Sequence, residues 1–340
     1  MANASTGWWV GSDGSGQLTT HFRRNISSAE LGEGSVVVDV EFSAVNYKDA
    51  LALTGKPGVL RKTPLIPGID AAGVVATSTS EKFPPGTRVV LTGFGYGETR
   101  NGGLATTVVA DDNHLVELPD QLSTRQAATL GTAGVTALLA LRALISHGIT
   151  PTSSTLPLAV TGAAGAVGSL AVFLAAQAGF ATTAITGRTD EAEYLKGLGA
   201  TAVVSRQEVL ALPTRPLQSE TYAGVIDQAG GSLLANLLAS TENNGVVAAC
   251  GLAGGIDLPA TVMPFILRGV TLVGINSVYQ SLEVRASLWE ELASHSETLP
   301  WDSLGTIVEL EDARDQAERV LSGATRGRVV IRMGDPTGRS

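Results

Sequence analysis

The sequence contains a single cysteine, Cys250, in 340 residues, so no disulfide can form within the chain. We expect this side chain to be a small buried hydrophobe. Basic residues are also scarce, because 23 Lys and Arg stand against 32 Asp and Glu and give a formal net charge of −9. This balance argues against nucleic acid and against an anionic membrane surface as partners.

Two targeting features are missing as well. No uninterrupted apolar stretch is long enough to span a bilayer, and the initial stretch MANASTGWWVGSDGSG lacks the basic start and apolar segment of a secretory signal. These absences favour a cytoplasmic protein. What is present is a globular composition, with 44% hydrophobic residues and 40 glycines, and the length suggests two domains.

The first 122 residues have the pattern of a β-rich domain. Apolar, β-branched runs such as GSVVVDVEFSAVN and GTRVVLTGFG are bounded by glycine and polar turns, and their spacing predicts a barrel-like domain of short strands. The pattern changes at residue 123. The next segment, STRQAATLGTAGVTALLALRALISHG, has helical spacing, and Ser123 with Gln126 predicts a capping box at its start.

Strands and helices alternate from Leu158 onward. LPLAV, VGSLAVFLAAQAG, FATTAIT, TDEAEYLKGLGA and TAVV follow in that order, and further strand candidates are YAGVIDQAG, GVVAACG and GVTLVGINSV. This alternation is typical of a doubly wound parallel sheet, so the predicted fold class is α/β. The last segment contains two helices and a strand, which either extend the second domain or return to the first.

Three glycines form the turn after the first strand of this alternation: Gly162, Gly165 and Gly168, in the pattern G-x-x-G-x-x-G. Such a turn lets the backbone approach a pyrophosphate and directs helix N-terminal amides at it. Its place between an apolar strand and an Ala-rich helix favours dinucleotide binding. The alternative is close strand–helix packing in a protein that binds no nucleotide.

The second strand of the alternation ends in Thr186, Gly187 and Arg188. An acidic residue there would hydrogen-bond the adenosine ribose and repel a 2′-phosphate, whereas a hydroxyl, an open backbone and a guanidinium suit a phosphate dianion. Arg206, just after the next strand, is placed to approach the same phosphate. The alternatives are that both arginines are solvated, or that Asp190 binds the ribose instead of offsetting a helix dipole. We therefore predict NADPH as the cofactor.

Several long segments give nearly the whole chain a resemblance to the medium-chain dehydrogenase/reductase superfamily. The sequence is most similar to its zinc-independent acrylyl-CoA reductase (NADPH) family of quinone-oxidoreductase-like enzymes. The matching segments are NYKDALALTGK (46–56), PGIDAAGVV (67–75), GTAGVTA (131–137), TGR (186–188), ACGLAGG (249–255) and TVMPFILRGVTLVGINSV (261–278). Such long matches are more specific than the glycine turn alone.

The resemblance implies a fold and an activity. The fold is a GroES-like β-barrel catalytic domain over residues 1–122, a Rossmann doubly wound parallel-sheet cofactor domain over 123–270, and a C-terminal return to the catalytic domain over 271–340. The implied activity is NADPH-dependent reduction of an activated C=C bond, acrylyl-CoA to propionyl-CoA. An NADPH:quinone or alkenal oxidoreductase and a non-catalytic NADPH-binding protein are the alternatives.

The resemblance also implies a set of NADP contacts in this sequence. One family contact, an Asn, aligns with Gly323, so that side-chain interaction is absent or replaced by backbone. The other implied contacts are Tyr47, Ala164, Gly165, Ala166, Val167, Thr186, Gly187, Arg188, Arg206, Leu252, Ile266 and Ser277.

We expect no metal. Zinc enzymes of the superfamily hold zinc with a Cys and with the His of a GHE motif, and these positions look like Asn46 and Ile69 here. An isoleucine cannot bind a metal, and the four histidines are scattered without ligand-like spacing. The hydride step needs no Lewis acid when the resulting enolate is stabilised by hydrogen bonds.

The segment NYKD contains the expected active-site residues. Tyr47 is the expected phenolic donor beside the nicotinamide, and Asn46 is expected to orient the substrate or the cofactor amide. Asp49 is expected to order this loop or to take part in a proton relay. The alternative is that Tyr47 only packs in the domain cleft while Asp49 makes surface contacts.

Two predictions concern partners. Lys56, Arg61 and Lys62 lie close together in sequence, and with Arg100 they predict a dock for the phosphates of an acyl-CoA thioester on an otherwise acidic chain. The alternative is a solvated loop. The run GVTLVGINSV resembles the edge strand that relatives pair across a dimer, which predicts a homodimer.

Overall fold

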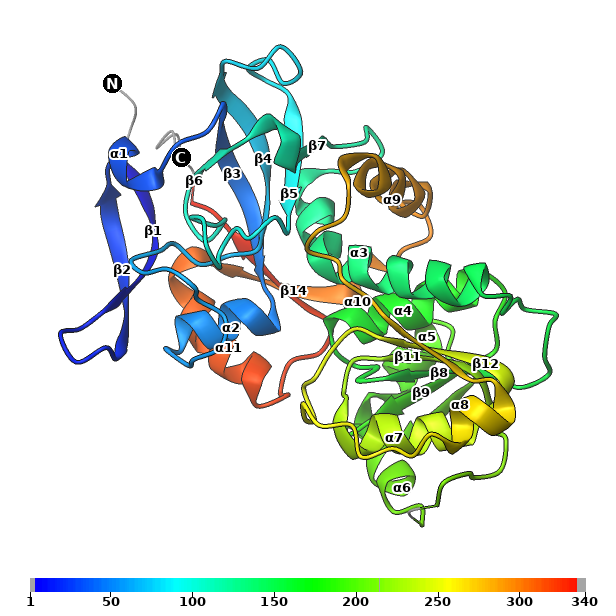
Figure 1. Ribbon diagram of the computed structural model, residues 1–340. Coiled ribbons are helices and arrows are strands. Elements are labelled where there is room, and N and C mark those ends of the chain that lie inside the picture. The colour runs from blue at the N-terminus through cyan, green and yellow to red at the C-terminus, as the bar shows by residue number, and fades with distance from the viewer. Residues whose placement is uncertain (1–3, 214, 335–340) are drawn as a thin grey trace. The chain divides into compact units, whose positions relative to one another are not determined.

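The structure is a computed structural model that describes residues 4–213 and 215–334. The chain divides into two compact units, each with its own sheet (Figure 1). Unit 1 comprises Met1–Val135 and Ser277–Ser340, and unit 2 comprises Thr136–Asn276. Unit 2 is therefore inserted into the sequence of unit 1.

The first division falls inside the helix α3 (Thr124–Ser146) rather than at its start. The predicted capping box is confirmed, because Ser123 N donates to Gln126 Oε1 at 2.8 Å. The helix breaks at Gly131, and the next residue, Thr132, donates its N–H to Asp70 in unit 1. This bond ties the start of α3 to unit 1, whereas the predicted boundary after residue 122 placed the whole helix in the cofactor domain.

The helix α3 also bears on the membrane prediction. By length and composition alone it could cross a bilayer, although the sequence offered no uninterrupted apolar run of that length. Its most apolar window is 72% buried inside the structure, which is the property of a core helix. The apolar side chains of α3 are therefore accounted for by packing within the protein.

Unit 1 is organised around a seven-stranded sheet in the order β14-β15-β3-β4-β5-β7, with β6 also paired to β3. A two-stranded sheet joins β1 to β2. The strands are β1 (Ser5–Ser12), β2 (Leu18–Ile26), β3 (Val36–Val45), β4 (Asp70–Ser78), β5 (Arg88–Thr92), β6 (Thr107–Ala110), β7 (Leu115–Glu117), β14 (Gly305–Glu309) and β15 (Arg328–Arg332). The helices of unit 1 other than α3 are α1 (Ser28–Leu31), α2 (Tyr47–Leu53), α9 (Leu282–Ser294), α10 (Trp301–Leu304) and α11 (Ala313–Leu321).

The C-terminal segment returns to unit 1. β15 pairs antiparallel with β3, so that Val330 lies opposite Ala44. The helix α11 packs against α2, and Trp8 donates its indole N–H to the carbonyl oxygen of Leu310 at 2.7 Å. Sequence patterns had left open whether this segment extends the second domain, and these pairings assign it to the first.

Unit 2 is a six-stranded parallel sheet in the order β10-β9-β8-β11-β12-β13. Helix α4 packs on β8 and β9, and α7 packs on β11 and β12 (Figure 1). The strands are β8 (Leu158–Thr161), β9 (Thr182–Thr186), β10 (Ala202–Ser205), β11 (Tyr222–Asp227), β12 (Thr241–Ala249) and β13 (Thr271–Gly274). The helices are α4 (Ala166–Gln177), α5 (Ala192–Gly197), α6 (Arg206–Leu210), α7 (Gly231–Ser240) and α8 (Met263–Arg268).

Candidate cofactor and active-site residues

The carboxyl edge of the unit 2 sheet is where most of the predicted cofactor residues lie. β8 and β11 are neighbours, although β9 and β10 come between them in the sequence. The chain therefore crosses from one side of β8 to the other, and this reversal of strand order opens a crevice at the carboxyl ends of the strands. Dinucleotides bind across such a crevice, with the pyrophosphate at the N-terminus of the first helix.

The glycine turn between β8 and α4 has the geometry that a pyrophosphate requires. Gly162 has a φ of +54°, which an L side chain rarely adopts. A Cβ at Gly168 would lie 2.6 Å from the Cα of Ala163, so α4 can approach the turn this closely only with glycine there. Gly165 is the N-cap of α4, whose first amides have no intrahelical acceptor. The turn thus offers backbone donors and no side-chain obstruction.

Arg188 directly follows the end of β9 and reaches back to the glycine turn. Its backbone N–H donates to Thr186 Oγ1 at 3.0 Å, which explains why a hydroxyl residue ends this strand. Its Nη2 donates to the carbonyl oxygen of Ala164 at 3.0 Å, and Nη1 lies 3.7 Å from Glu191 Oε1. The guanidinium is therefore held beside the turn, where the adenosine ribose of a dinucleotide is bound in this fold.

Arg206 joins Arg188 at this edge, as the sequence pattern suggested. β10 pairs in parallel with β9 so that Ser205 lies opposite Thr186, and Arg206 follows at once. Its Nη2 is 3.1 Å from the position that a Cβ would take at Gly187. The side chain thus lies over the open backbone of that glycine. Asp190, the rival ribose ligand, is exposed in the single 3-10 turn Thr189–Glu191.

A buried carboxylate at the end of β11 organises the other side of the crevice. Asp227 accepts hydrogen bonds from Thr161 Oγ1 and from Gly230 N, both at 2.8 Å. Burial raises the pKa of this carboxyl. The next residue, Gln228, donates its backbone N–H to the same Thr161 hydroxyl at 2.9 Å. The sequence pattern did not single out these residues, since a lone Asp after a strand has no specific signal.

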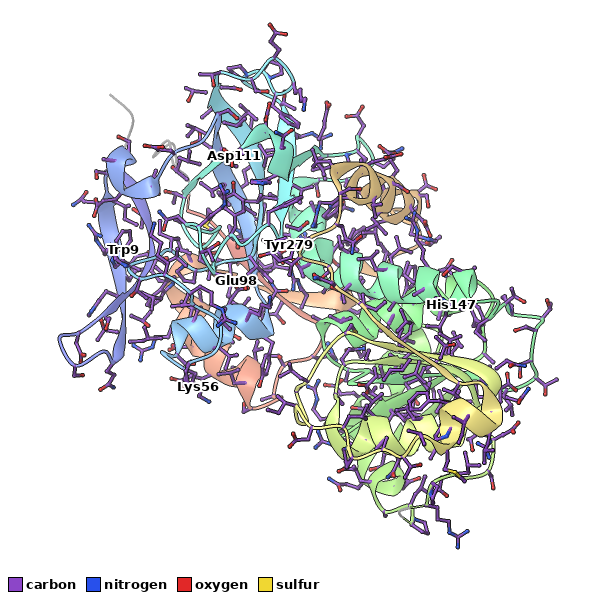
Figure 2. The ribbon with its side chains drawn as sticks, in the orientation of Figure 1. Trp9, Lys56, Glu98, Asp111, His147 and Tyr279 are labelled. Carbon is purple, nitrogen blue, oxygen red and sulfur yellow. The ribbon has the colours of Figure 1, made fainter. Side chains whose placement is uncertain are left out.

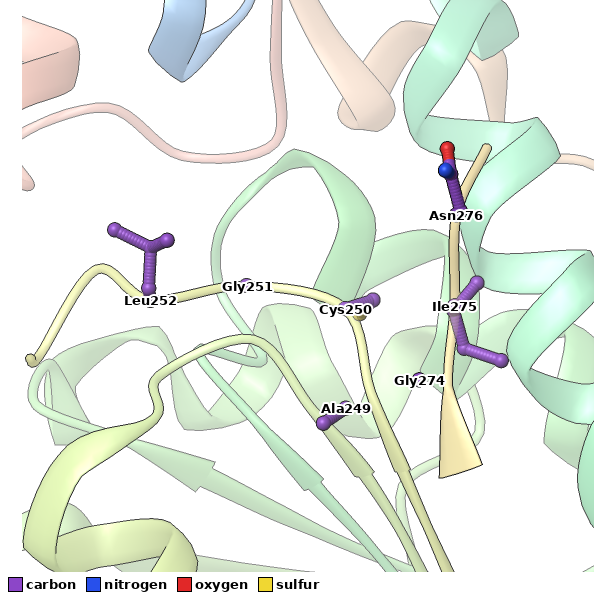
Figure 3. Close-up of a pocket in the computed structure, with 7 residues that line it drawn as sticks. All are labelled: Ala249, Cys250, Gly251, Leu252, Gly274, Ile275 and Asn276. Carbon is purple, nitrogen blue, oxygen red and sulfur yellow. The ribbon is translucent and has the colours of Figure 1, made fainter. Parts of the chain in front are cut away.

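A shallow pocket of about 400 Å³ lies at the carboxyl ends of β12 and β13 (Figure 3). Leu252, a predicted cofactor contact, lines it together with Ala249, Cys250, Gly251, Gly274, Ile275 and Asn276. Cys250 was expected to be a small buried hydrophobe, but it is only partly buried and its Sγ donates to the carbonyl oxygen of Asp227. Burial still raises the pKa of the Cys250 thiol to about 12, so it is no thiolate nucleophile at neutral pH.

The remaining predicted cofactor contacts differ in their surroundings. Ala166 and Val167 are the half-buried first residues of α4. Ile266 lies on α8 and is 68% exposed, outside the residues that line the pocket. Ser277 is the first residue of the second segment of unit 1, where its carbonyl oxygen accepts a hydrogen bond from Arg285. Gly323 lies just after α11 with a φ of +71°.

In unit 1, Asn46 and Asp49 form the N-terminal cap of α2. Asp49 Oδ2 accepts from the backbone N–H and from Nδ2 of Asn46, and Oδ1 accepts from Ile69 N, at 2.8 to 2.9 Å. Asp49 is 1% exposed, and burial raises its pKa to about 6 despite these donors. Of the two roles expected for Asp49, the geometry matches the ordering of this loop.

The cap continues into a buried ion-pair network that the sequence did not reveal. Arg328, on β15, donates to Asn46 Oδ1 and to Asp70 Oδ2, and both members of the ion pair are almost fully buried. Asn46 Nδ2 also donates to Asp70, and Thr132 donates to its other oxygen. The network joins α2 to β4, α3 and β15, so three other segments of the chain fix the start of α2.

Tyr47, the first residue of α2, projects from this fixed helix end. Its side chain is 41% exposed, so its phenol is available to a ligand. The adjacent Lys48 makes an ion pair with Glu98 at 2.7 Å, which ties the same helix end to the loop after β5. Within unit 1, Tyr47 is therefore an exposed donor on a rigid support.

The four residues predicted to bind the CoA phosphates differ in their ion pairing. Lys56, Arg61 and Lys62 are exposed, and these three cations make no ion pair with any residue that the structure describes. Arg100, by contrast, pairs with Asp111 at 2.8 Å. Figure 2 shows Lys56 beside α2 and Asp111 at the other end of the neighbouring strands. Arg100 therefore differs from the other three in having an acidic partner, and its contact with a CoA phosphate stays a prediction.

These two units define an oxidoreductase of the medium-chain dehydrogenase/reductase class, and comparisons with known proteins agree. A family model described as "Alcohol dehydrogenase GroES-like domain" matches residues 32–120, and one described as "Zinc-binding dehydrogenase" matches residues 166–294. The acrylyl-CoA reductase AcuI of Ruegeria pomeroyi is 46% identical over 91% of this chain and 93% of its own length. The chain therefore belongs to the medium-chain dehydrogenase/reductase family, in the group that contains the acrylyl-CoA reductases.

Two solved structures extend the comparison. That of Escherichia coli YhdH with bound NADPH has a TM-score of 0.91 and 41% identity, and it covers 96% of this chain and 99% of that chain. That of Bacillus subtilis YhfP with NAD bound has a TM-score of 0.90 and 37% identity with the same coverage. YhfP is described as a putative quinone oxidoreductase. The predicted fold, a GroES-like domain with a Rossmann cofactor domain, is confirmed.

Proposed function

We propose that this protein is an NADPH-dependent reductase of activated C=C bonds that converts acrylyl-CoA to propionyl-CoA. The observation that carries the cofactor assignment is the pair of arginines, Arg188 and Arg206, at the end of β9, where a 2′-phosphate distinguishes NADPH from NADH. The acceptor assignment rests on the similarity to acrylyl-CoA reductase over most of the chain.

The residues of each unit have separate tasks in this reaction. When bound, NADPH supplies a hydride to the β-carbon of the alkene, and a proton taken up at the α-carbon completes the two-electron reduction. In unit 2, the glycine turn and the arginines hold the phosphates of the dinucleotide. In unit 1, the cap of α2 fixes Tyr47, whose hydroxyl is our candidate donor to the enolate oxygen that develops on the thioester.

We also propose that the reaction proceeds without zinc. Asn46, at the position of a zinc-binding cysteine, already uses its carboxamide to bind Arg328, Asp49 and Asp70. The guanidinium of Arg328 supplies the positive charge that Asp70 requires, and it would repel a second cation. Elemental analysis should find no stoichiometric zinc, and chelators should leave activity intact. One tightly bound zinc per chain, with activity lost on its removal, would overturn this proposal.

Reduction of a quinone or an alkenal is the second candidate. The observations that favour it are the relationship to a putative quinone oxidoreductase and the apolar lining of the pocket, to which Leu252 and Ile275 contribute. Initial rates of NADPH oxidation with acrylyl-CoA, crotonyl-CoA, a short quinone and an alkenal separate the candidates. No turnover of any acceptor by protein that binds NADPH would favour the non-catalytic alternative.

A sharper experiment tests whether CoA itself is recognised. Binding energy from a remote group can position a reacting centre, so acrylyl-CoA should have a much higher kcat/KM than an acrylyl thioester that lacks the nucleotide. The double variant Arg61→Ala/Lys62→Ala should lower kcat/KM for acrylyl-CoA and leave kcat/KM for the truncated thioester unchanged. Added salt should likewise lower kcat/KM for acrylyl-CoA more than for the truncated thioester. Arg24→Ala/Lys82→Ala is the matched control, since it removes equal charge from another exposed part of unit 1. Equal kcat/KM values for the two thioesters would favour reduction of a quinone or an alkenal as the function.

The homodimer is likewise a proposal. β13 is the last strand of the unit 2 sheet, with β12 as its one neighbour among the described strands. The same unit also exposes several large apolar side chains: Leu252, Ile256, Leu258, Val262, Ile266 and Leu267. An open strand edge on a unit with exposed apolar side chains is suited to pairing with a second copy.

The cytoplasmic location and the absence of nucleic-acid and membrane partners stay predictions.

A further inference from the structure

Gln228 carries a buried amide donor that has nothing to bind. It is the first residue after β11, at the crevice beside β8. Its Nε2 is inaccessible to solvent and makes no hydrogen bond with the residues that the structure describes. Burying a polar group without a partner is costly, so an atom in this state requires an explanation.

The carboxamide lies against the glycine turn. A Cβ at Gly162 would be 3.3 Å from Gln228 Oε1 and 3.9 Å from its Cβ and Cδ, so the side chain covers the open face of that glycine. Gly162 begins the turn between β8 and α4, where the pyrophosphate of a dinucleotide binds in this fold. The donor therefore stands next to the backbone on which the dinucleotide phosphates are expected to rest.

The backbone around Gln228 holds the side chain in this place. Its N–H is bound by the Thr161 hydroxyl, which Asp227 orients. Its carbonyl oxygen accepts from Ala253 N at 3.3 Å, and Gly251 packs directly on the same peptide. Gln228 is thus anchored from β8 and from the loop after β12, while its carboxamide has no anchor of its own.

Strand order determines which half of the dinucleotide this donor meets. The two arginines stand at β9, on one side of β8, whereas Gln228 stands at β11, on the other. A dinucleotide lies across the switch point with one mononucleotide on each side. We propose that the Gln228 carboxamide turns toward the crevice when NADPH binds, so that Nε2 donates a hydrogen bond to an acceptor oxygen in the nicotinamide mononucleotide half, on its ribose or its phosphate. This inference rests on the proposed NADPH dependence.

The test is Gln228→Met, which keeps the side-chain length and removes the donor. Dissociation constants for NADPH, NADH and adenosine 2′,5′-bisphosphate are measured by titration calorimetry, without any acceptor. NADPH and NADH should each bind about five- to thirtyfold more weakly, and adenosine 2′,5′-bisphosphate should bind as before. Gln177→Met, at the exposed far end of α4, is the matched control and should change none of the three.

Two further measurements separate this role from a structural one. The melting temperature of ligand-free Gln228→Met should equal or exceed that of the wild type, because the substitution removes an unpaired buried donor. Gln228→Glu should weaken NADPH binding more than Gln228→Met, since a carboxylate offers acceptors and negative charge.

Several outcomes overturn the proposal. For Gln228→Met, these are an unchanged affinity for NADPH, an equal loss of affinity for adenosine 2′,5′-bisphosphate, or a lowered melting temperature. For Gln228→Glu, it is an NADPH affinity no lower than that of Gln228→Met. Failure of the wild-type protein to bind NADPH at all would instead overturn the proposed function, so the two failures are distinguishable.

Discussion

Arg188 is the residue on which cofactor selectivity depends most directly. Arg188→Leu should raise the KM for NADPH about ten- to hundredfold, because one charge-assisted contact to the 2′-phosphate is lost. The KM for NADH should hardly change, since NADH has no such phosphate. Steady-state kinetics with both cofactors and one acceptor give this comparison. Equal losses for NADPH and NADH would refute the assignment of Arg188 to the 2′-phosphate.

Asp49 should give the stability of the protein a distinct pH dependence. Its pKa rises from 3.8 to about 6 on burial, so the folded state retains a proton that the unfolded chain has released. Stability from such a carboxyl is present at low pH and is lost as the pH rises through the folded pKa. Between pH 5 and 7.5 the free energy of unfolding should lose on the order of 1 kcal/mol from this group.

Comparison with Asp49→Asn isolates this contribution, because His114, whose pKa burial lowers, titrates in the opposite sense in both proteins. Urea denaturation at a series of pH values measures the two slopes. The variant should lose less stability than the wild type as the pH rises, whatever its absolute stability. Parallel slopes would show that Asp49 is already ionised at pH 5.

Single residues differ in how far the sequence reveals them. Arg188 was predictable because its role follows from its place at the end of a strand, next to a recognisable glycine turn. Arg328 was not, because its partner Asn46 lies 282 residues away and only the folded sheet brings them together. Gln228 belongs to no sequence motif, and its significance depends on a buried donor whose lack of a partner is visible only in the folded structure.

At the scale of elements, the connection from β8 to α4 should be intolerant of added volume. Gly168→Ala places a methyl group 2.6 Å from the Cα of Ala163, so helix and turn must separate. NADPH and NADH should both bind at least tenfold more weakly, and the melting temperature should fall, because the turn and the core shift together.

Gly197→Ala is the control for this change. It also adds one methyl group to a helix of unit 2, but no atom lies within 4 Å of the new position. This variant should bind both cofactors normally and be slightly more stable, because alanine is the better helix former. Normal cofactor affinity in Gly168→Ala would mean that the turn adapts without loss.

Elements with strong local signals were predicted, and elements without them were missed. The start of α3 was predictable from Ser123 and Gln126, whose capping bonds are local. β14 was missed because its five residues are mostly half-exposed and it is held by pairing with β15 alone. The break at Gly131 depends on Asp70 and Arg328, which approach it from other parts of unit 1.

At the scale of the whole molecule, the proposed dimer depends on the edge of β13. Val273 is half-exposed on this strand and is not part of the unit 2 core cluster. Val273→Lys places a charge at the edge, a device by which proteins prevent strand pairing. Sedimentation equilibrium should find a dimer for the wild type and a monomer for the variant, with the fold retained by circular dichroism. A wild type that sediments as a monomer would refute the dimer.

The insertion of unit 2 between the two segments of unit 1 has a consequence for the order of events on the ribosome. Every strand of unit 2 is synthesised before β15, whereas β3, which pairs early with β4 and β6, gains its third neighbour only when β15 is made. Asp70 therefore emerges long before Arg328, its counter-ion. Since domains generally fold as units during synthesis, unit 2 should mature first and unit 1 last. Limited proteolysis of stalled nascent chains should show unit 2 protected once residue 276 is free of the tunnel, and unit 1 only after residue 334.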